Sequence, residues 1–265
     1  LELFGADVSI EGDLNGDGFN DVVISSPGYL SNRGRVSIFY GGALLDNDPD
    51  VVIYGENEGD HFGNSISTNG DINGDGFDDL LVGARMFNGA RGKAYIYLGA
   101  TVMDSTADRT YLGENIGEEF GYKVAMGKVG TDNFTDYLIS SPKRSSAQGR
   151  VYYYFGSSTP ISLPNLTFIG ESANSNYGVS CDIVGDVNGD SYGDFLIGAH
   201  NFDSAKGKAY LYYGIPNGSI NSNLNLIGEA NDNFYGFSVS KAGDINKDGY
   251  KDFIIGAPGF NSLKG

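Results

Sequence analysis

The chain has 265 residues, of which 34 are acidic and 17 are basic, and its formal net charge at pH 7 is −17. This balance argues against nucleic-acid binding, which needs clustered Lys and Arg side chains. No apolar run approaches the roughly 20 residues that a membrane-spanning helix requires. The single cysteine, Cys181, excludes an intrachain disulfide, and its alternating apolar neighbours predict a buried side chain.

Five copies of one pattern fill the chain, and each copy opens with an aromatic residue followed by glycine. The spacings between these pairs are 58, 58, 57 and 58 residues, and the pairs are Phe4-Gly5, Phe62-Gly63, Phe120-Gly121, Tyr177-Gly178 and Tyr235-Gly236. Each copy is expected to form four short antiparallel strands, but the fifth stops at Gly265 before its third and fourth strands.

One small sheet of this kind cannot bury both of its faces alone, so the repeat predicts the blades of a β-propeller. We therefore expect an all-β fold in which residues 1–265 form a single domain of about 4.5 blades. The paired glycines should let neighbouring blades approach closely, while the aromatic rings fill the layer between blades.

An acidic nine-residue loop lies between the first and second predicted strands of four copies. Oxygen-bearing side chains stand at loop positions 1, 3, 5 and 9, and the backbone carbonyl of position 7 is a further candidate ligand. Calcium accepts six to eight such oxygens in irregular geometry. The predicted calcium ligands are Asp13, Asn15, Asp17, Phe19 and Asp21; Asp71, Asn73, Asp75, Phe77 and Asp79; Asp186, Asn188, Asp190, Tyr192 and Asp194; and Asp244, Asn246, Asp248, Tyr250 and Asp252.

An EF-hand is the alternative for these loops, because their first six positions fit its pattern. That motif requires a bidentate Glu at position 12 and flanking helices. Position 12 is instead Ile24, Val82, Ile197 or Ile255, each within a β-branched run. The acidic loop is therefore predicted to be a turn between two strands.

The third copy departs from the loop pattern. Lys128, Gly130, Asp132 and Asp136 stand where the other copies carry Asp, Asn, Asp and Asp. Two ligands are lost and an ammonium group occupies position 1. We expect four calcium sites in total, and we expect Lys128 to replace the third ion by pairing with Asp132 or Asp136.

The Phe-Gly opening, the Asp-x-Asn-x-Asp-Gly-x-x-Asp loop and the turn at Gly256-Ala257-Pro258 resemble the FG-GAP repeats of integrin α-subunit propellers. The resemblance covers the whole chain. It implies a ring of seven blades, to which this chain contributes a fragment or which outside strands complete. It also implies that the ions are structural and that partners bind on the face opposite the calcium loops.

Charged residues recur at two further places in each copy. Because one strand of an antiparallel pair ends where its neighbour begins, we expect cross-strand ion pairs within each copy. The acidic members are Glu56, Glu114, Glu171 and Glu229, after the fourth strands, and the basic members are Arg35, Lys93, Arg150 and Lys208, at the start of the third strands.

Two sets of loops are candidates for ligand contact, because loops on a rigid scaffold commonly carry function. Both sets are expected at the end of the sheets opposite the calcium loops. Loops between second and third strands carry Arg33, Arg85, Arg91, Lys143, Arg144 and Lys206, and loops before the aromatic-Gly pairs carry Glu58, Asp60, Glu118, Glu119 and Asp232.

No catalytic motif emerges, so the chain is predicted not to be an enzyme. His61 and His200 lie in different copies without a linked nucleophile, and no glycine-rich phosphate loop opens a helix. Three Asn-x-Ser/Thr sequons make Asn133, Asn165 and Asn217 candidate glycosylation sites in a secreted glycoprotein.

We expect an extracellular or cell-surface adhesion module, stabilised by calcium, that recognises a protein partner. Two other functions are open. Tyr-rich pockets between blades would suit a lectin-like propeller that binds carbohydrate, and heterologous self-assembly would make the chain a structural subunit of an extracellular coat. An accessory propeller of an enzyme is a further alternative.

Overall fold

The computed structural model describes residues 2–43, 47–159, 161–214 and 220–263. The chain divides into two compact units. Unit 1 comprises residues 1–126 and 156–162, and unit 2 comprises residues 127–155 and 163–265. In the described part, no helix has the length and apolar character needed to cross a membrane.

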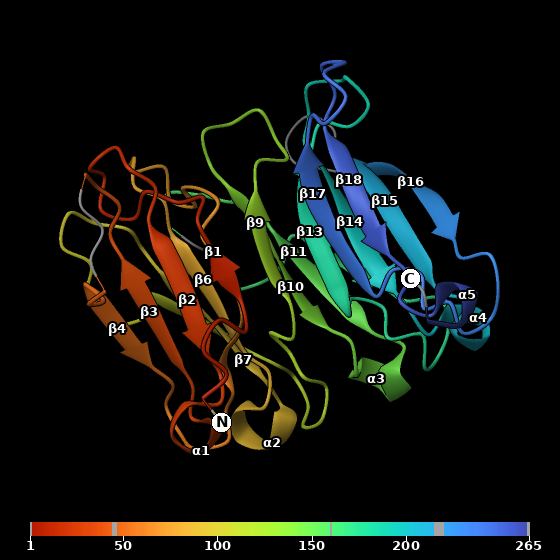
Figure 1. Cartoon of the computed structure of the whole chain (residues 1–265), viewed down its shortest axis with the longest axis horizontal. Coiled ribbons are helices and arrows are strands. Elements are labelled where there is room, and N and C mark those ends of the chain that lie inside the picture. Colours follow the sequence, from red (N-terminus) through yellow and green to blue (C-terminus); the bar gives the residue numbers. More distant parts are fainter. Residues whose placement is uncertain (1, 44–46, 160, 215–219, 264–265) are drawn as a thin grey trace. The chain divides into compact units, whose positions relative to one another are not determined.

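Four copies form a four-stranded antiparallel sheet each, and the fifth forms a two-stranded sheet (Figure 1). The first two sheets consist of β1 (Val8–Ser9), β2 (Val22–Ser26), β3 (Arg35–Phe39) and β4 (Val51–Tyr54), and of β5 (Phe62–Ser67), β6 (Leu80–Ala84), β7 (Lys93–Tyr97) and β8 (Arg109–Leu112). The others consist of β9 (Val124–Gly127), β10 (Asp136–Ser141), β11 (Arg150–Tyr154) and β12 (Leu166–Ile169); of β13 (Ser180–Gly185), β14 (Asp194–Ala199), β15 (Lys208–Gly214) and β16 (Ile220–Ile227); and of β17 (Ser238–Gly243) and β18 (Asp252–Gly256). The predicted blade pattern is confirmed.

In the second, third and fourth sheets the second strand (β6, β10 and β14) is buried along its whole length. In the four-stranded sheets the second strand pairs in register with the third, so that Val23 lies opposite Ile38 in the first sheet. Strands buried on both faces have near-continuous apolar sequences, and this is why the sequence predicts them.

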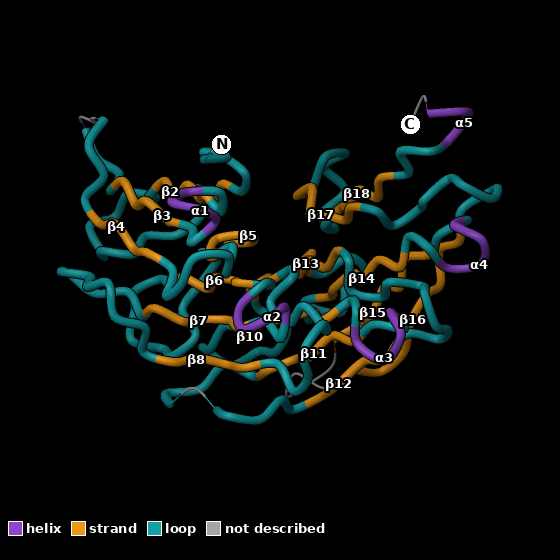
Figure 2. The backbone as a smooth tube through the Cα atoms, turned by 90° about the horizontal axis from the view of Figure 1, so that it is seen from below, coloured by secondary structure: helices purple, strands orange, loops and turns teal. Residues whose placement is uncertain are grey.

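Among the residues that the structure describes, five one-turn helices follow the second strands, and the sequence did not predict them (Figure 2). In α2, Asn88 has φ 49° and Gly89 has φ 70°, so the turn is largely left-handed. Asn, Gly and small polar residues tolerate this conformation better than branched residues do. The helices are α1 (Tyr29–Asn32), α2 (Phe87–Ala90), α3 (Arg144–Ala147), α4 (Phe202–Ala205) and α5 (Phe260–Leu263).

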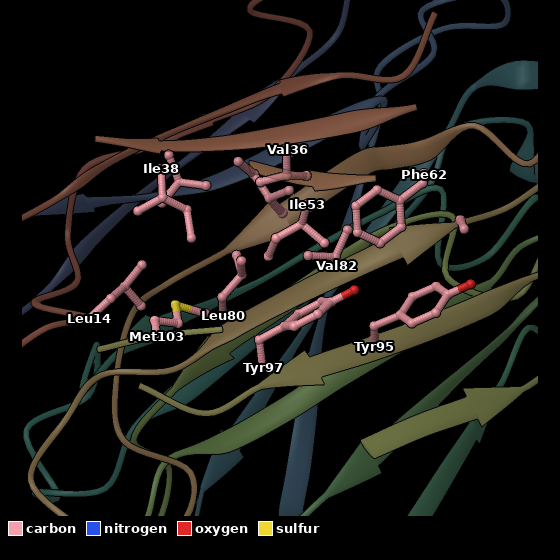
Figure 3. Packing of buried hydrophobic residues seen from close by; sticks show 13 residues of the cluster. Leu14, Val36, Ile38, Ile53, Phe62, Leu80, Val82, Tyr95, Tyr97 and Met103 are labelled. Atoms are coloured by element: carbon pink, nitrogen blue, oxygen red, sulfur yellow. The ribbon is translucent and has the colours of Figure 1, made fainter. Parts of the chain in front are cut away.

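The core of unit 1 lies between its first two sheets. Figure 3 shows Val36, Ile38 and Ile53 of the first sheet facing Leu80 and Val82 of the second. All five side chains are at most 1% exposed. This layer removes the apolar face of each sheet from water, which is the main stabilising contribution to the packing.

The aromatic ring that opens a copy does fill the layer between sheets. Phe62 is fully buried, and its ring meets that of Tyr95 edge to face with centroids 5.2 Å apart. Tyr177 packs in the same way on Tyr210 in unit 2, at 5.0 Å. The expectation from the sequence is confirmed for these two copies.

Glycines bring the backbones of successive copies into contact. Gly92 forms a parallel bridge with Phe120, and a Cβ added at Gly92 would lie 2.0 Å from the Phe120 carbonyl oxygen. A Cβ at Gly121 would lie 2.5 Å from the Lys93 carbonyl oxygen. Any larger residue at either position would force the two backbones apart.

Candidate metal-binding loops

The acidic loops share one conformation. They comprise loop 1 (residues 13–21), loop 2 (71–79), loop 4 (186–194) and loop 5 (244–252). In loop 1, Asp13 Oδ2 accepts the Gly18 N–H at 2.8 Å, Asn15 Oδ1 accepts the Asp17 N–H at 3.0 Å, and Asn15 Nδ2 donates to Asp17 Oδ2 at 3.0 Å. The same bonds recur in loops 2, 4 and 5. The fold thus gathers positions 1, 3 and 5 around one tight turn.

The position-9 carboxylate fastens loops 1, 2 and 4 to their sheets. Asp21 is fully buried, and it accepts the N–H of Leu14 at 2.7 Å and that of Gly41, just beyond β3, at 2.8 Å. Asp79 and Asp194 make the equivalent two bonds. Position 9 therefore fixes both the loop and a glycine at or just beyond the end of the third strand.

Burial raises the pKa of the position-9 carboxylates. It raises the pKa of Asp79 to about 7 and that of Asp194 to about 6, and it also raises the pKa of Asp21. Backbone hydrogen bonds lower these pKa values, whereas repulsion from the Asp side chains at positions 1 and 5 raises them. A cation held in the loop would offset that repulsion.

The donor set fits calcium by its chemistry, because each loop supplies hard oxygens from three Asp, one Asn and one backbone carbonyl. Across the described residues, no three His, Cys, Asp or Glu side chains converge as a metal-holding group. Positions 1, 3 and 5 lie around one turn, while position 9 is engaged by backbone N–H groups. The structure brings the first three predicted ligands together and keeps the fourth in the sheet.

The third copy satisfies its acidic residue without an ion. Lys128 is exposed, and the described contacts give it no ion pair with Asp132 or Asp136. Asp136 is buried and accepts the Tyr153 hydroxyl at 2.8 Å, and Asp132 accepts the Phe134 N–H at 3.1 Å. The predicted pairing of Lys128 is therefore wrong. Tyr153 satisfies this carboxylate from a strand position where the other copies carry Ile38, Ile96 and Leu211.

The recurring ion pairs join successive copies instead of two strands of one copy. Lys93 pairs with Glu56, and Lys208 pairs with Glu171. Each ammonium also lies over an aromatic ring, with Lys93 Nζ 4.8 Å from the Tyr95 centroid and Lys208 Nζ 4.3 Å from the Tyr210 centroid. The prediction of pairs within one copy is wrong for these two lysines, because their side chains point to the preceding copy.

The two sets of candidate ligand loops contact each other through backbone hydrogen bonds. In unit 1 the N–H of Met86 donates to the Asp60 carbonyl at 3.2 Å, and Gly59 donates to Ser31 at 3.0 Å. Several of the charged residues have structural partners. Arg33 and Arg91 donate through Nε to the carbonyls of Gly55 at 2.6 Å and Gly113 at 2.5 Å, which end the fourth-strand segments.

The predicted sequons have different outcomes. Asn133 and Asn165 are exposed, and Asn165 Oδ1 accepts the Phe155 N–H at 2.7 Å. Asn217 lies outside the described residues. Exposure is the condition that a glycan attached to either of the first two would require.

Repeated four-stranded antiparallel sheets that pack face on face define a partial β-propeller. The chain belongs to the FG-GAP repeat family, which matches residues 4–39, 62–97, 183–212 and 235–265. The matched segments leave out the third copy, where the acidic loop is altered.

Among curated proteins the chain is similar to integrin alpha subunits. Integrin alpha-PS2 of Drosophila melanogaster is 30% identical over 220 residues, and Integrin alpha-5 of Xenopus laevis is 27% identical over 216, each alignment covering 76% of this chain. Integrin alpha-V of Gallus gallus is 30% identical over 208 residues, or 73% of this chain. These alignments span only 15% to 20% of the relatives' own length.

Proposed function

We propose that residues 1–265 belong to one extracellular propeller, stabilised by calcium, that acts as an adhesion module for a protein partner and not as an enzyme. The observation that supports it most is the similarity to integrin alpha subunits across three quarters of the chain, together with four FG-GAP segments. The two compact units would be parts of that one propeller.

Calcium would bind in loops 1, 2, 4 and 5 through positions 1, 3, 5 and 9 and the carbonyl of position 7. The ion would neutralise carboxylates that otherwise repel one another and would tie the first strand of a sheet to the second. Because the loops exist in this form only in the folded chain, binding would add to folding stability.

The partner would bind at the end of unit 1 opposite the acidic loops. A cavity of about 580 Å³ lies there between residues 57–60 and 86–90. Ile116 is 75% exposed and borders Gly89 of this cavity, and Leu30 is 53% exposed in the neighbouring turn α1. Exposed apolar side chains beside charged groups are typical of protein interfaces.

Replacing Ile116 with Lys is expected to weaken partner binding about tenfold or more, as loss of a central apolar contact does. Thermal stability should stay unchanged because the side chain is exposed. Val102→Lys is the matched control, since Val102 is 85% exposed and lies two residues after Ala100, whose N–H donates to the Leu14 carbonyl of loop 1. Equal losses for both variants would show that the partner does not use this end of unit 1.

The class of partner is tested by binding the immobilised protein, in millimolar calcium, to an extracellular-matrix protein mixture before and after enzymatic removal of glycans. Saturable binding that survives glycan removal supports the proposal. Binding that disappears with the glycans, or that free sugar competes away, would assign the chain to the lectins instead.

A further inference from the structure

Loop position 8 of one copy touches the metal-binding loop of the copy before it. In unit 1, Asp78 Oδ2 accepts the N–H of Asp13 at 2.9 Å, and the Asp78 N–H donates to the Asp13 carbonyl at 3.1 Å. Beside this contact the Phe77 ring lies against Gly16, where an added Cβ would be 2.5 Å from Cε1. Loop 2 is thus fastened to loop 1 at Asp13, the first proposed ligand of loop 1.

The same contact joins loops 4 and 5 in unit 2, but the charge is opposite. The Lys251 N–H donates to the Asp186 carbonyl at 2.9 Å, and Tyr250 lies against Gly189 as Phe77 does against Gly16. The Lys251 side chain runs over Gly185, the residue before Asp186. The carboxylate of Asp78 therefore adjoins loop 1, whereas the side chain of Lys251, which carries an ammonium group, adjoins loop 4 at the equivalent position.

We propose that the position-8 residue of the following copy sets the calcium affinity of the loop it touches. Asp78 strengthens binding in loop 1, and Lys251 weakens binding in loop 4. The inference rests on the proposed calcium binding. Its physical basis is that a half-buried carboxylate one hydrogen bond from a ligand residue attracts a divalent ion with little screening, whereas a nearby ammonium repels it.

Asp78 has a second, mechanical contribution to loop 1. Its two hydrogen bonds hold the peptide groups on either side of the Asp13 Cα. The backbone that carries the Asp13 carboxylate, the first proposed ligand, is therefore fixed. The Lys251 side chain is exposed, so its charge is better screened and its effect should be smaller.

Site-resolved calcium titration of the full chain by amide NMR tests this assignment. The Gly18 N–H reports loop 1, because it donates to Asp13 at 2.8 Å, and the Ser191 N–H reports loop 4, because it donates to Asp186 at 2.7 Å. Asp78→Asn keeps an acceptor oxygen but removes the charge. It should weaken loop 1 on the order of tenfold and leave loop 4 unchanged.

Lys251→Gln should tighten calcium binding in loop 4 about threefold and leave loop 1 unchanged. Glu58→Gln is the control for Asp78→Asn, because it removes the same negative charge at the opposite end of β5. Unchanged loop 1 affinity in Asp78→Asn, while the wild-type Gly18 signal responds to calcium, would overturn this inference alone. No response at Gly18 or Ser191 in the wild type would overturn the proposed calcium binding and this inference with it.

Discussion

Removing calcium with excess EGTA is expected to lower the midpoint of thermal unfolding by about 10–20 °C. When the free calcium concentration is 100 times the dissociation constant of a site, binding at that site stabilises the folded state by about 2.7 kcal/mol. Each compact unit contains two acidic loops, so its two ions act on the same packed sheets. Without them, the buried carboxylates of Asp79 and Asp194 keep their repulsive neighbours.

Differential scanning calorimetry in calcium and in EGTA measures this shift. Asp71→Ala removes position 1 of loop 2, and this variant should show a smaller difference between the two conditions. Magnesium at the same concentration should restore less stability, because it dehydrates reluctantly and needs near-ideal octahedral geometry. Coincident midpoints with and without calcium would contradict a structural role for the ions.

Replacing Gly92 with Ala is expected to cost about 4 kcal/mol of unfolding free energy, at the upper end for a single substitution. Gly92 has φ +81°, and the added Cβ would stand 2.0 Å from the Phe120 carbonyl oxygen. The obstacle is backbone of the next copy, so a side-chain rotation cannot relieve it.

Gly117→Ala separates the two causes of that loss. Gly117 has nearly the same φ, +82°, but an added Cβ would meet no atom within 4 Å. Backbone strain alone should cost about 1–2 kcal/mol there. Urea unfolding of both variants tests the difference. Equal losses of unfolding free energy would show that glycine is not required at position 92 by its close approach to Phe120.

The strands and the acidic loops were predictable because their signals are local. The apolar run before Ser25 marks β2, and the oxygen-bearing residues from Asp13 to Asp21 mark a turn within nine residues of sequence. The 58-residue repeat then transfers each assignment to the other copies. Local pattern and internal repetition together determine the elements and the order in which they pair.

Contacts between copies were not predictable in the same way. The sequence suggested that Lys93 would meet Glu114, but its ammonium reaches back to Glu56. Antiparallel pairing sets which backbones are adjacent, whereas the packing of one sheet on the next decides where a long side chain points. The contact of Asp78 with Asp13 was missed for that reason.

The left-handed turns and the altered third loop escaped prediction for a different reason. Nothing in the run Phe87–Ala90 signals three successive residues with positive φ, because Gly and Asn suit many kinds of turn. In the third copy, opposite charges suggested that Lys128 would pair with Asp136, but the Tyr153 hydroxyl lies on the adjacent strand and reaches the buried carboxylate.

The number of calcium ions bound per chain tests the central claim most directly. Native mass spectrometry of the intact protein in a volatile calcium buffer should show four ions, one for each complete acidic loop, and Asp71→Ala should show three. A chain that binds no calcium, or a count that Asp71→Ala leaves unchanged, would contradict the account.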